Sequence, residues 1–294
     1  MTAPKHIQIE TQDGLTLPGL LYEAQHAQKA MIYLHGNGSS SVFYNDDQRS
    51  ELAKALHHKG VSLLMFNNRG AHYIKKLSFK NGESKRFGCA YEKIKECIYD
   101  IDGAVEFLEG QGYKEFFLIG ESTGANKICV YHFYKPNNKI SKYILVSGGD
   151  DTGIYYDYYG KEKFFRLLKE AKDTIEVNKG EDLIKELLPD EIFSYQAFYD
   201  TCNPDGDYNV FPYLEVIKDL KLSTKPLFRY AQSIDKPTLV IYGGKDQYAL
   251  EGGEKSIEIL KKYCPDFTYS LIEGADHALT QHQKEYADIV SEWL

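Results

Sequence analysis

Residues 120–124 read Gly-Glu-Ser-Thr-Gly and carry more information than any other part of the chain. They follow an apolar run, residues 115–119, that predicts a buried strand, and they precede residues 125–131, which can form a helix. A Gly-x-Ser-x-Gly pattern between a strand and a helix puts the serine on a sharp turn, with its hydroxyl exposed in a cleft. The glycines let neighbouring backbone pass where a side chain would clash. Ser122 is therefore the candidate nucleophile, and a structural turn serine is the alternative.

Strands and helices alternate along the chain on both sides of this turn. Apolar runs predict strands at 29–34, 61–66, 143–146, 237–242 and 267–272, and helical spacing predicts helices at 46–58, 91–109, 253–262 and 278–293. Two further strands, 6–10 and 15–21, are joined at Asp13-Gly14, which is a typical hairpin turn. Alternation with nearly continuous apolar strands predicts an α/β fold, with a mostly parallel central sheet flanked by helices.

This alternation is interrupted between residues 150 and 234, a segment rich in aromatic residues. Helices are predicted within it at 164–170 and 182–188. We interpret residues 150–234 as an inserted cap, and residues 1–149 and 235–294 as the α/β core. The cap is expected above the carboxyl edge of the sheet, because open α/β sheets bind ligands there. The alternative is a detour that packs on the outside of the domain.

A serine hydroxyl needs a base, and the base needs a carboxylate that holds its tautomer. Of the nine histidines, His277 is the best candidate, because it lies in a loop directly after the last predicted strand. Asp246 follows the strand 237–242 in a Gly-Gly-Lys-Asp turn, which gives the chain order Ser, Asp, His expected for this architecture. Asp150 and Asp151, one strand earlier, are the alternatives for the acid.

The oxyanion that forms during acyl transfer needs two positioned donors. The backbone N–H of Thr123, directly after the nucleophile, is expected to supply one of them. The N–H of Asn37 is expected to supply the other, from the glycine-containing loop at 34–40. Such a loop could also cradle a phosphate, but it lacks the spacing of a nucleotide-binding loop.

Two other stretches allow more than one interpretation. Arg69, in Asn67-Asn68-Arg69-Gly70, is expected to pin the oxyanion loop by hydrogen bonds, and a surface position is the alternative. The irregular stretch 71–88 contains several basic residues between Lys75 and Arg86. It could attract an anionic substrate, although a solvated loop is the simpler interpretation.

Composition excludes several classes of function. The chain has 294 residues, 43% of them hydrophobic, and a net charge of −8, which argues against a nucleic-acid partner. No run approaches the roughly 18 apolar residues of a membrane span, and the first twenty residues show no secretory signal. The five cysteines match neither a zinc site nor a redox pair. We therefore expect a cytoplasmic protein with reduced thiols that acts on a small molecule, with no nucleic-acid or membrane partner.

Taken together, these residues resemble the α/β-hydrolase superfamily, over residues 29–148 and 236–294. The resemblance is carried, in chain order, by His35-Gly36, Asn68-Arg69-Gly70, the Gly-Glu-Ser-Thr-Gly turn, Asp246 and His277. The Gly-Glu-Ser form is similar to that of many carboxylesterases. The Ser-Thr-Gly sequence and the stretch 149–156 look like a group that includes siderophore-ester hydrolases. The resemblance implies an α/β-hydrolase fold with an inserted cap.

The expected activity is that of a serine hydrolase that cleaves a small-molecule carboxylic ester without a metal or organic cofactor. A serine at position 122 argues against the epoxide hydrolases and haloalkane dehalogenases of this fold, which use a carboxylate there. Tyr155, Tyr156 and Tyr159 are expected to bind substrate, and packing inside the cap is the alternative for these rings. A thioesterase or amidase with the same residues, or a binding protein without catalysis, is also open.

Overall fold

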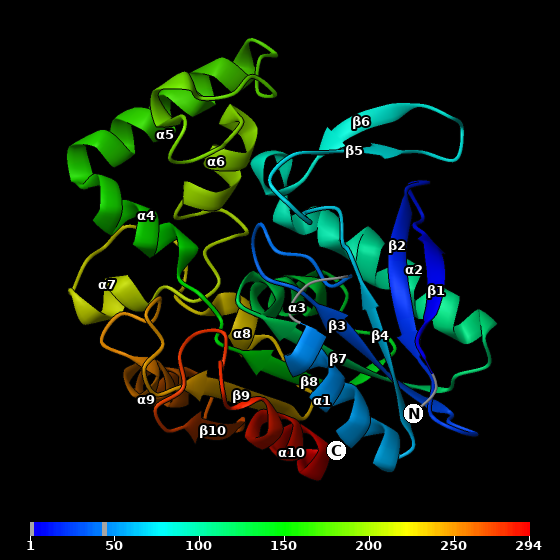
Figure 1. Ribbon diagram of the computed structural model, residues 1–294. Coiled ribbons are helices and arrows are strands. Elements are labelled where there is room, and N and C mark those ends of the chain that lie inside the picture. The colour runs from blue at the N-terminus through cyan, green and yellow to red at the C-terminus, as the bar shows by residue number, and fades with distance from the viewer. Residues whose placement is uncertain (1–2, 43–45) are drawn as a thin grey trace.

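The computed structural model describes residues 3–42 and 46–294, and its centre is a sheet of eight described strands (Figure 1). Their spatial order is β1-β2-β4-β3-β7-β8-β9-β10. The strands are β1 (Lys5–Glu10), β2 (Thr16–Tyr22), β3 (Lys29–Leu34), β4 (Val61–Phe66), β7 (Glu115–Glu121), β8 (Ile140–Val146), β9 (Thr238–Gly243) and β10 (Thr268–Ile272). The strands from β4 to β10 in this order are parallel, and the hairpin β1–β2 adds antiparallel strands at one edge. The predicted α/β class and its mostly parallel sheet are confirmed.

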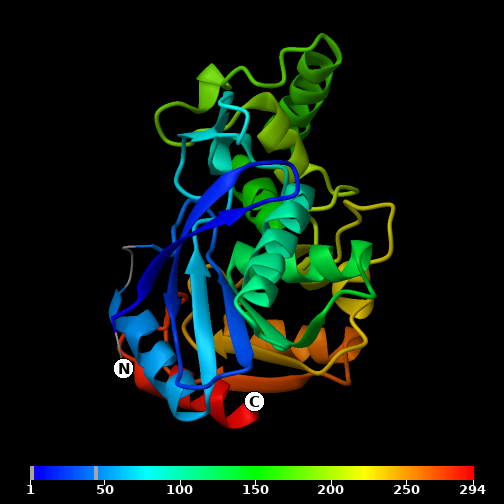
Figure 2. The same cartoon turned by 90° about the vertical axis from the view of Figure 1, so that its right-hand side faces the viewer.

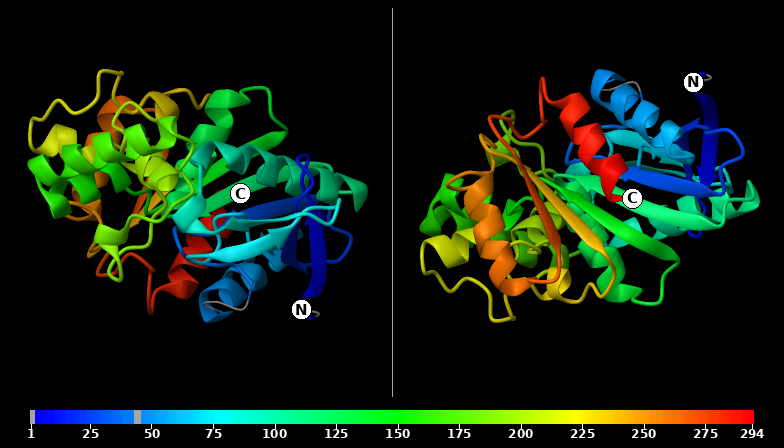
Figure 3. Two further views of the ribbon diagram at one scale, coloured as in Figure 1. Left: turned by 90° about the horizontal axis from the view of Figure 1, so that it is seen from above. Right: turned by 90° about the horizontal axis from the view of Figure 1, so that it is seen from below.

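Helices cover both faces of the sheet (Figure 3). One face carries α1 (Asp46–His58) and α10 (Gln283–Trp293); the other carries α2 (Cys97–Gly110), α3 (Thr123–Tyr134) and α9 (Gly253–Tyr263). Successive residues of a strand point to opposite faces. In β3, Met31 therefore packs in the cluster with α1 and α10, whereas Ile32 packs in the cluster with α2, α3 and α9. Burial on both faces explains why the strands are nearly continuous apolar runs.

Several helices lie between β8 and β9. They are α4 (Asp151–Tyr159), α5 (Lys161–Glu176), α6 (Tyr195–Cys202), α7 (Tyr213–Ile217) and α8 (Arg229–Gln232). Helices α4 to α6 extend beyond the carboxyl edge of the sheet and share a separate apolar cluster that includes Phe164 and Phe198 (Figure 1, Figure 2). Tyr213 of α7 and Tyr230 of α8 belong instead to the core on the face of the sheet that α2, α3 and α9 cover. The segment thus has an outer part and an inner part.

Some predicted elements differ from the structure. The predicted helix at 182–188 is only a 3₁₀ turn, Lys185–Leu187, because Pro189 disfavours helical backbone at the residue before it. The predicted irregular stretch 71–88 contains a hairpin, β5 (Lys75–Ser78) and β6 (Ser84–Phe87), whose Leu77 and Phe87 are buried in the main core. These two apolar side chains pack the hairpin against the core.

Two helices start later than predicted. Helix α2 begins at Cys97, after 3₁₀ turns at Cys89–Tyr91 and Ile94–Glu96. The backbone N–H of Ile94 donates to the Asp200 carboxylate of α6 at 2.8 Å, and not to a carbonyl oxygen of a preceding helical turn. Helix α10 begins at Gln283, because Leu279 and Gln281 have φ values of 54° and 65°, which interrupt helical backbone. Within the described ranges, no helix combines the length and the apolar character needed to cross a membrane.

Candidate active site

The loops that follow the parallel strands meet at the carboxyl edge of the sheet. Ser122 follows β7, Asp246 lies in the loop after β9, and His277 lies in the loop after β10. Ser122 and His277 line one cavity of about 500 Å³, together with Asn37 from the loop after β3. The fold therefore brings together residues that lie more than 150 positions apart in the sequence.

Ser122 occupies a strained turn between β7 and α3. Its backbone angles are φ 53° and ψ −125°, a region that residues other than glycine seldom adopt. A Cβ added at Gly120 would lie 2.3 Å from the backbone of Gly124, and one added at Gly124 would lie 2.4 Å from the carbonyl oxygen of Leu34. The prediction that both glycines allow a close backbone approach is confirmed.

His277 is held by the loop that follows β9. Its Nδ1 lies 2.9 Å from each carboxylate oxygen of Asp246, a side chain that is almost completely buried. A proton on Nδ1 satisfies this carboxylate and leaves Nε2 free to accept a proton. The backbone N–H of His277 donates to Gln247 Oε1 at 3.1 Å, and the ring of Tyr248 packs edge-on against the imidazole at 4.8 Å between centroids.

The other two candidate acids have different partners. Asp150 accepts hydrogen bonds from the backbone N–H groups of Gly153 and Leu214, each at 2.7 Å, and therefore joins the starts of α4 and α7. Burial raises the pKa of Asp150 to about 7. Asp151 accepts from Asn126 Nδ2 at 3.2 Å and lines the Ser122 cavity. Of the three carboxylates, the geometry matches only Asp246 to the imidazole.

The two expected oxyanion donors come from different segments, the start of α3 and the loop after β3. Thr123 is the first residue of α3, where backbone N–H groups have no partner within the helix and the helix dipole favours negative charge. Asn37 is exposed at the wall of the cavity. Its loop is anchored by Asn67 Oδ1, which accepts from the N–H groups of Ser41 at 2.7 Å and Val42 at 2.9 Å.

Arg69 has a role different from the predicted one. It is buried and does not pin the oxyanion loop; its guanidinium donates to Asp100 of α2 at 2.9 Å and to Asp13 in the β1–β2 turn at 2.9 Å. A buried guanidinium requires carboxylate partners, and α2 and the hairpin supply them. Asn67, two residues earlier, holds the loop, together with the backbone N–H of His72, which donates to the Ser39 carbonyl at 3.0 Å.

Comparison with known proteins identifies the family. A sequence model of the family described as serine aminopeptidase, S33, matches residues 25–284, which is most of the chain. The chain belongs to this family. It is an α/β hydrolase, as the sequence resemblance predicts.

Individual relatives of this S33 family member are distant. It is 28% identical over 145 residues to a tear acid lipase-like protein of Mesocricetus auratus, covering 46% of this chain and 35% of the relative. It is 24% identical over 201 residues to a monoacylglycerol lipase of Rattus norvegicus, covering 62% and 55%. The chain thus spans about a third and about half the length of these curated relatives.

Among solved structures, Est1E from Butyrivibrio proteoclasticus has a similar fold. The TM-score is 0.62, with 14% sequence identity, and the match covers 99% of this chain and 97% of that chain. At this identity, the likeness concerns the fold alone.

The predicted substrate-binding tyrosines of the S33 family member separate in the structure. Tyr155 lines the Ser122 cavity. Tyr156 packs against Phe164 at 5.3 Å between centroids, and Tyr159 stacks on Tyr155 at 5.9 Å, one helical turn further from the nucleophile. Both rings pack against the apolar cluster of α4 to α6 and lie outside the described lining of the cavity. For these two, the alternative of packing inside the segment matches the structure.

Three other tyrosines line the cavity, Tyr73, Tyr158 and Tyr248, and sequence reasoning missed Tyr73 and Tyr248. Tyr73 lies in the loop after β4, and Tyr248 lies two residues after Asp246. Their position just beyond strand ends was the available signal, because loops at the carboxyl edge surround the ligand site. Tyr158 comes from α4.

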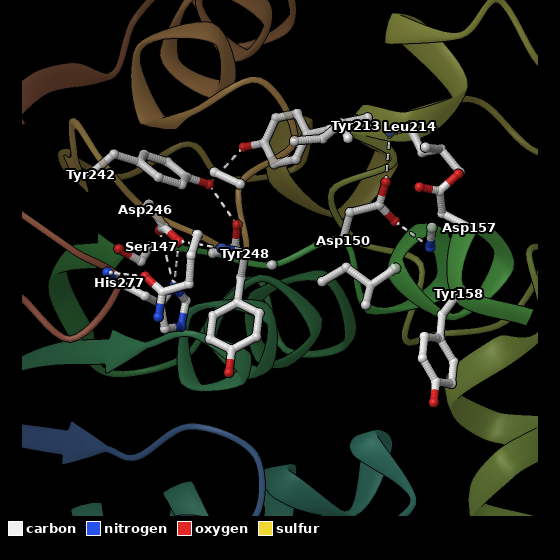
Figure 4. A pocket seen from close by; sticks show the side chains of 17 residues that line it. Ser147, Asp150, Asp157, Tyr158, Tyr213, Leu214, Tyr242, Asp246, Tyr248 and His277 are labelled. Carbon is white, nitrogen blue, oxygen red and sulfur yellow. Dashed lines mark hydrogen bonds and ion pairs between the residues drawn. The ribbon is translucent and has the colours of Figure 1, made fainter. Parts of the chain in front are cut away.

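A second cavity of about 300 Å³ adjoins the first beyond His277 (Figure 4). Its wall includes Leu214, Tyr213 and Tyr242; the Tyr242 hydroxyl donates to the Gly148 carbonyl at 2.6 Å. The two cavities share His277 and three side chains between them: Ile154, Tyr158 and Tyr248. Over the described residues, no group of three or more His, Cys, Asp or Glu side chains is arranged to hold a metal ion.

Proposed function

We propose that this S33 family member is a serine hydrolase that cleaves a carboxylic ester of a small molecule through an acyl-enzyme. The observation that carries the proposal is the pair formed by His277 and Asp246, which opens onto the same cavity as Ser122 on its strained turn. The names of the two curated relatives, a lipase-like protein and a monoacylglycerol lipase, support ester chemistry.

The proposed reaction has two steps. The Ser122 hydroxyl oxygen attacks the ester carbonyl carbon while His277 Nε2 takes its proton, and the oxyanion accepts from the N–H groups of Thr123 and Asn37. The C–O bond to the leaving group then breaks, and His277 returns the proton to the departing alkoxide. Water, deprotonated by His277, attacks the acyl-enzyme and releases the acid and the free serine. Asp246 holds the imidazole and stabilises its protonated form.

We also propose that the segment 150–234 acts as the cap of this site. In support, Ile154, Tyr155 and Tyr158 of α4 line the cavity, and Phe193 reaches it from the loop before α6. A cytoplasmic location is part of the proposal. It is supported by the five cysteines, which are all buried free thiols.

A fluorophosphonate probe tests the activated serine. Wild type is expected to gain one covalent adduct by intact mass, on the peptide that contains Ser122, and Ser122→Ala is expected to gain none. Ser147→Ala is the matched control, because Ser147 also follows a core strand at positive φ and is buried nearby. An unlabelled wild type would contradict the proposal and favour a binding protein without catalysis.

An amidase is the second candidate, because the matched family is described as a serine aminopeptidase. Esters, thioesters and anilides that share one acyl group separate the possibilities. The ester is expected to have the highest kcat/KM in a reaction that Ser122→Ala abolishes. A higher kcat/KM for the anilide or the thioester would reassign the reaction while leaving the nucleophile unchanged.

A further inference from the structure

The mouth of the Ser122 cavity carries exposed aromatic rings. Tyr73, Tyr158 and Tyr248 are 57%, 66% and 57% exposed, although all three line the cavity. Figure 4 draws the adjoining second cavity, where the rings of Tyr158 and Tyr248 come from different elements and project in the same direction. Packing does not account for three large rings left in water around one opening, and a ligand that covers them does.

Charged groups of the same wall define what kind of ligand would cover these rings. Three carboxylates line the cavity, Glu121, Asp151 and Glu191, and among the described residues no lysine or arginine lines it. Burial raises the pKa of Glu121, and the charge of Arg49 opposes this effect. Asp151 and Glu191 thus face the cavity without a lysine or arginine in the described wall, where His277 is the one other group that can carry a positive charge.

Asp151 has no task in the proposed ester cleavage. It accepts a hydrogen bond from the neutral amide of Asn126 at 3.2 Å. Lys127, whose charge also reaches Asp151, is buried in an ion pair with Glu92 at 2.6 Å. Burial raises the pKa of Asp151 to about 6, and the charge of His277 in the same wall opposes this effect only in part. In the first turn of α4, the charge of Asp151 interacts favourably with the helix dipole. That interaction does not require the carboxylate to face a cavity.

Glu191 approaches from the loop before α6. It accepts a hydrogen bond from the Tyr155 hydroxyl at 3.5 Å, and burial raises its pKa. Tyrosine faces attract cations within about 6 Å of the ring centre, and the attraction grows when the cation is desolvated. Rings and carboxylates around one opening thus favour a positive charge and disfavour an anion.

We infer that the substrate is an ester that carries an ammonium group, held over the tyrosine rings and opposite Asp151 and Glu191 while its carbonyl lies at Ser122. This inference rests on the proposed function, since the same cavity must perform the cleavage. The ammonium group gives the substrate its orientation and takes no part in bond breaking.

Two isosteric esters test the charge alone. Butyrylcholine and 3,3-dimethylbutyl butyrate have the same shape, but a carbon replaces the charged nitrogen in the second. Wild type is expected to show a kcat/KM at least roughly tenfold higher for the choline ester. The ratio of the two values is expected to fall several-fold in Asp151→Asn and in Tyr158→Leu, and with rising salt concentration. Asp190→Asn, beside Glu191 but outside the cavity wall, is the matched control and should keep the wild-type ratio.

The outcomes separate this inference from the proposed function. Ser122-dependent hydrolysis of the neutral ester with a ratio near one would overturn the inference and leave the proposed function intact. If neither ester is cleaved, calorimetry measures the affinity of the Ser122→Ala variant for choline and for its neutral isostere, 3,3-dimethylbutanol. Choline bound at least roughly tenfold more tightly supports a cation site. Equal binding, or binding unaffected by Asp151→Asn, overturns it.

Discussion

Gly36 lies directly against the nucleophile: a Cβ added at Gly36 would be 3.0 Å from Cβ of Ser122 and 3.5 Å from its hydroxyl oxygen. The same atom would lie 3.4 Å from the carbonyl oxygen of Glu121. These neighbours are backbone and a strained turn, which cannot move aside as a flexible side chain does. The absence of a side chain at position 36 therefore sets the space around the reacting oxygen.

Gly36→Ala is expected to lower kcat by roughly ten- to a thousandfold, because it displaces the Ser122 hydroxyl or the neighbouring oxyanion loop. The expected change in melting temperature is small by comparison. Gly110→Ala is the matched control, since an added Cβ meets nothing within 4 Å there. Steady-state kinetics with thermal unfolding checks the prediction, and an equal effect of both substitutions on kcat would contradict it.

Asp246→Asn is expected to lower kcat by roughly 10³–10⁴-fold, because an amide no longer holds the Nδ1 proton of His277 or stabilises the imidazolium. Asp150→Asn is expected to cost less than about tenfold per folded molecule, since Asp150 bonds backbone N–H groups of α4 and α7. The measurement is kcat normalised to the folded fraction. The reverse order of the two losses would assign the acid to Asp150.

Arg69→Met is expected to destabilise the protein by about 3–5 kcal/mol, because it leaves the buried carboxylate of Asp100 without its cation. The double variant Arg69→Met with Asp100→Asn should recover much of this loss, because the asparagine carries no charge. Its side-chain oxygen can still accept a hydrogen bond from the backbone N–H of residue 69. Urea unfolding measures both. Additive losses would show that the ion pair is not the source of the effect.

Asp200→Asn is expected to stabilise the protein at pH 8 and to have a shrinking effect as the pH falls to 4. Burial raises the pKa of Asp200 to about 7, from an ordinary value of 3.8. The folded state therefore binds more protons than the unfolded state between these values, so wild-type stability falls as the pH rises through this window. Asparagine stays neutral and still accepts from Ile94.

Free energies of unfolding at pH 4, 6 and 8 check this sign. A difference between Asp200→Asn and wild type that is independent of pH, or that grows toward pH 4, would contradict the prediction. Glu258→Gln on the surface of α9 is a control of opposite sign, because hydrogen bonds from Lys255 and Lys262 lower the pKa of Glu258, so this substitution should not stabilise the protein at pH 8.

Much of the candidate site follows from chain order. In a parallel sheet, the loops after the strands all lie at one edge, so Ser122 after β7 and His277 after β10 are brought together by any sequence with this alternation. The glycines at 120 and 124 are also predictable, because a turn this tight excludes side chains from them.

The sequence does not decide which of several similar side chains meets a given partner. Asp150, Asp151 and Asp246 all follow core strands, and sequence spacing does not tell which carboxylate reaches the imidazole. Arg69 illustrates the same limit, because its partners Asp13 and Asp100 come from elements that only the folded chain brings beside it.

The amino-acid sequence by itself determined the alternation of strands and helices, the serine turn and the edge of the sheet where the site lies. These features depend on short-range periodicity and on backbone sterics. The tertiary structure decided which side chains meet: Asp246 with His277, Asn67 with the loop after β3, and Tyr73, Tyr158 and Tyr248 around one opening. Such pairings depend on strand register and helix rotation between distant segments, and a change of one residue in either turns a side chain away from its partner.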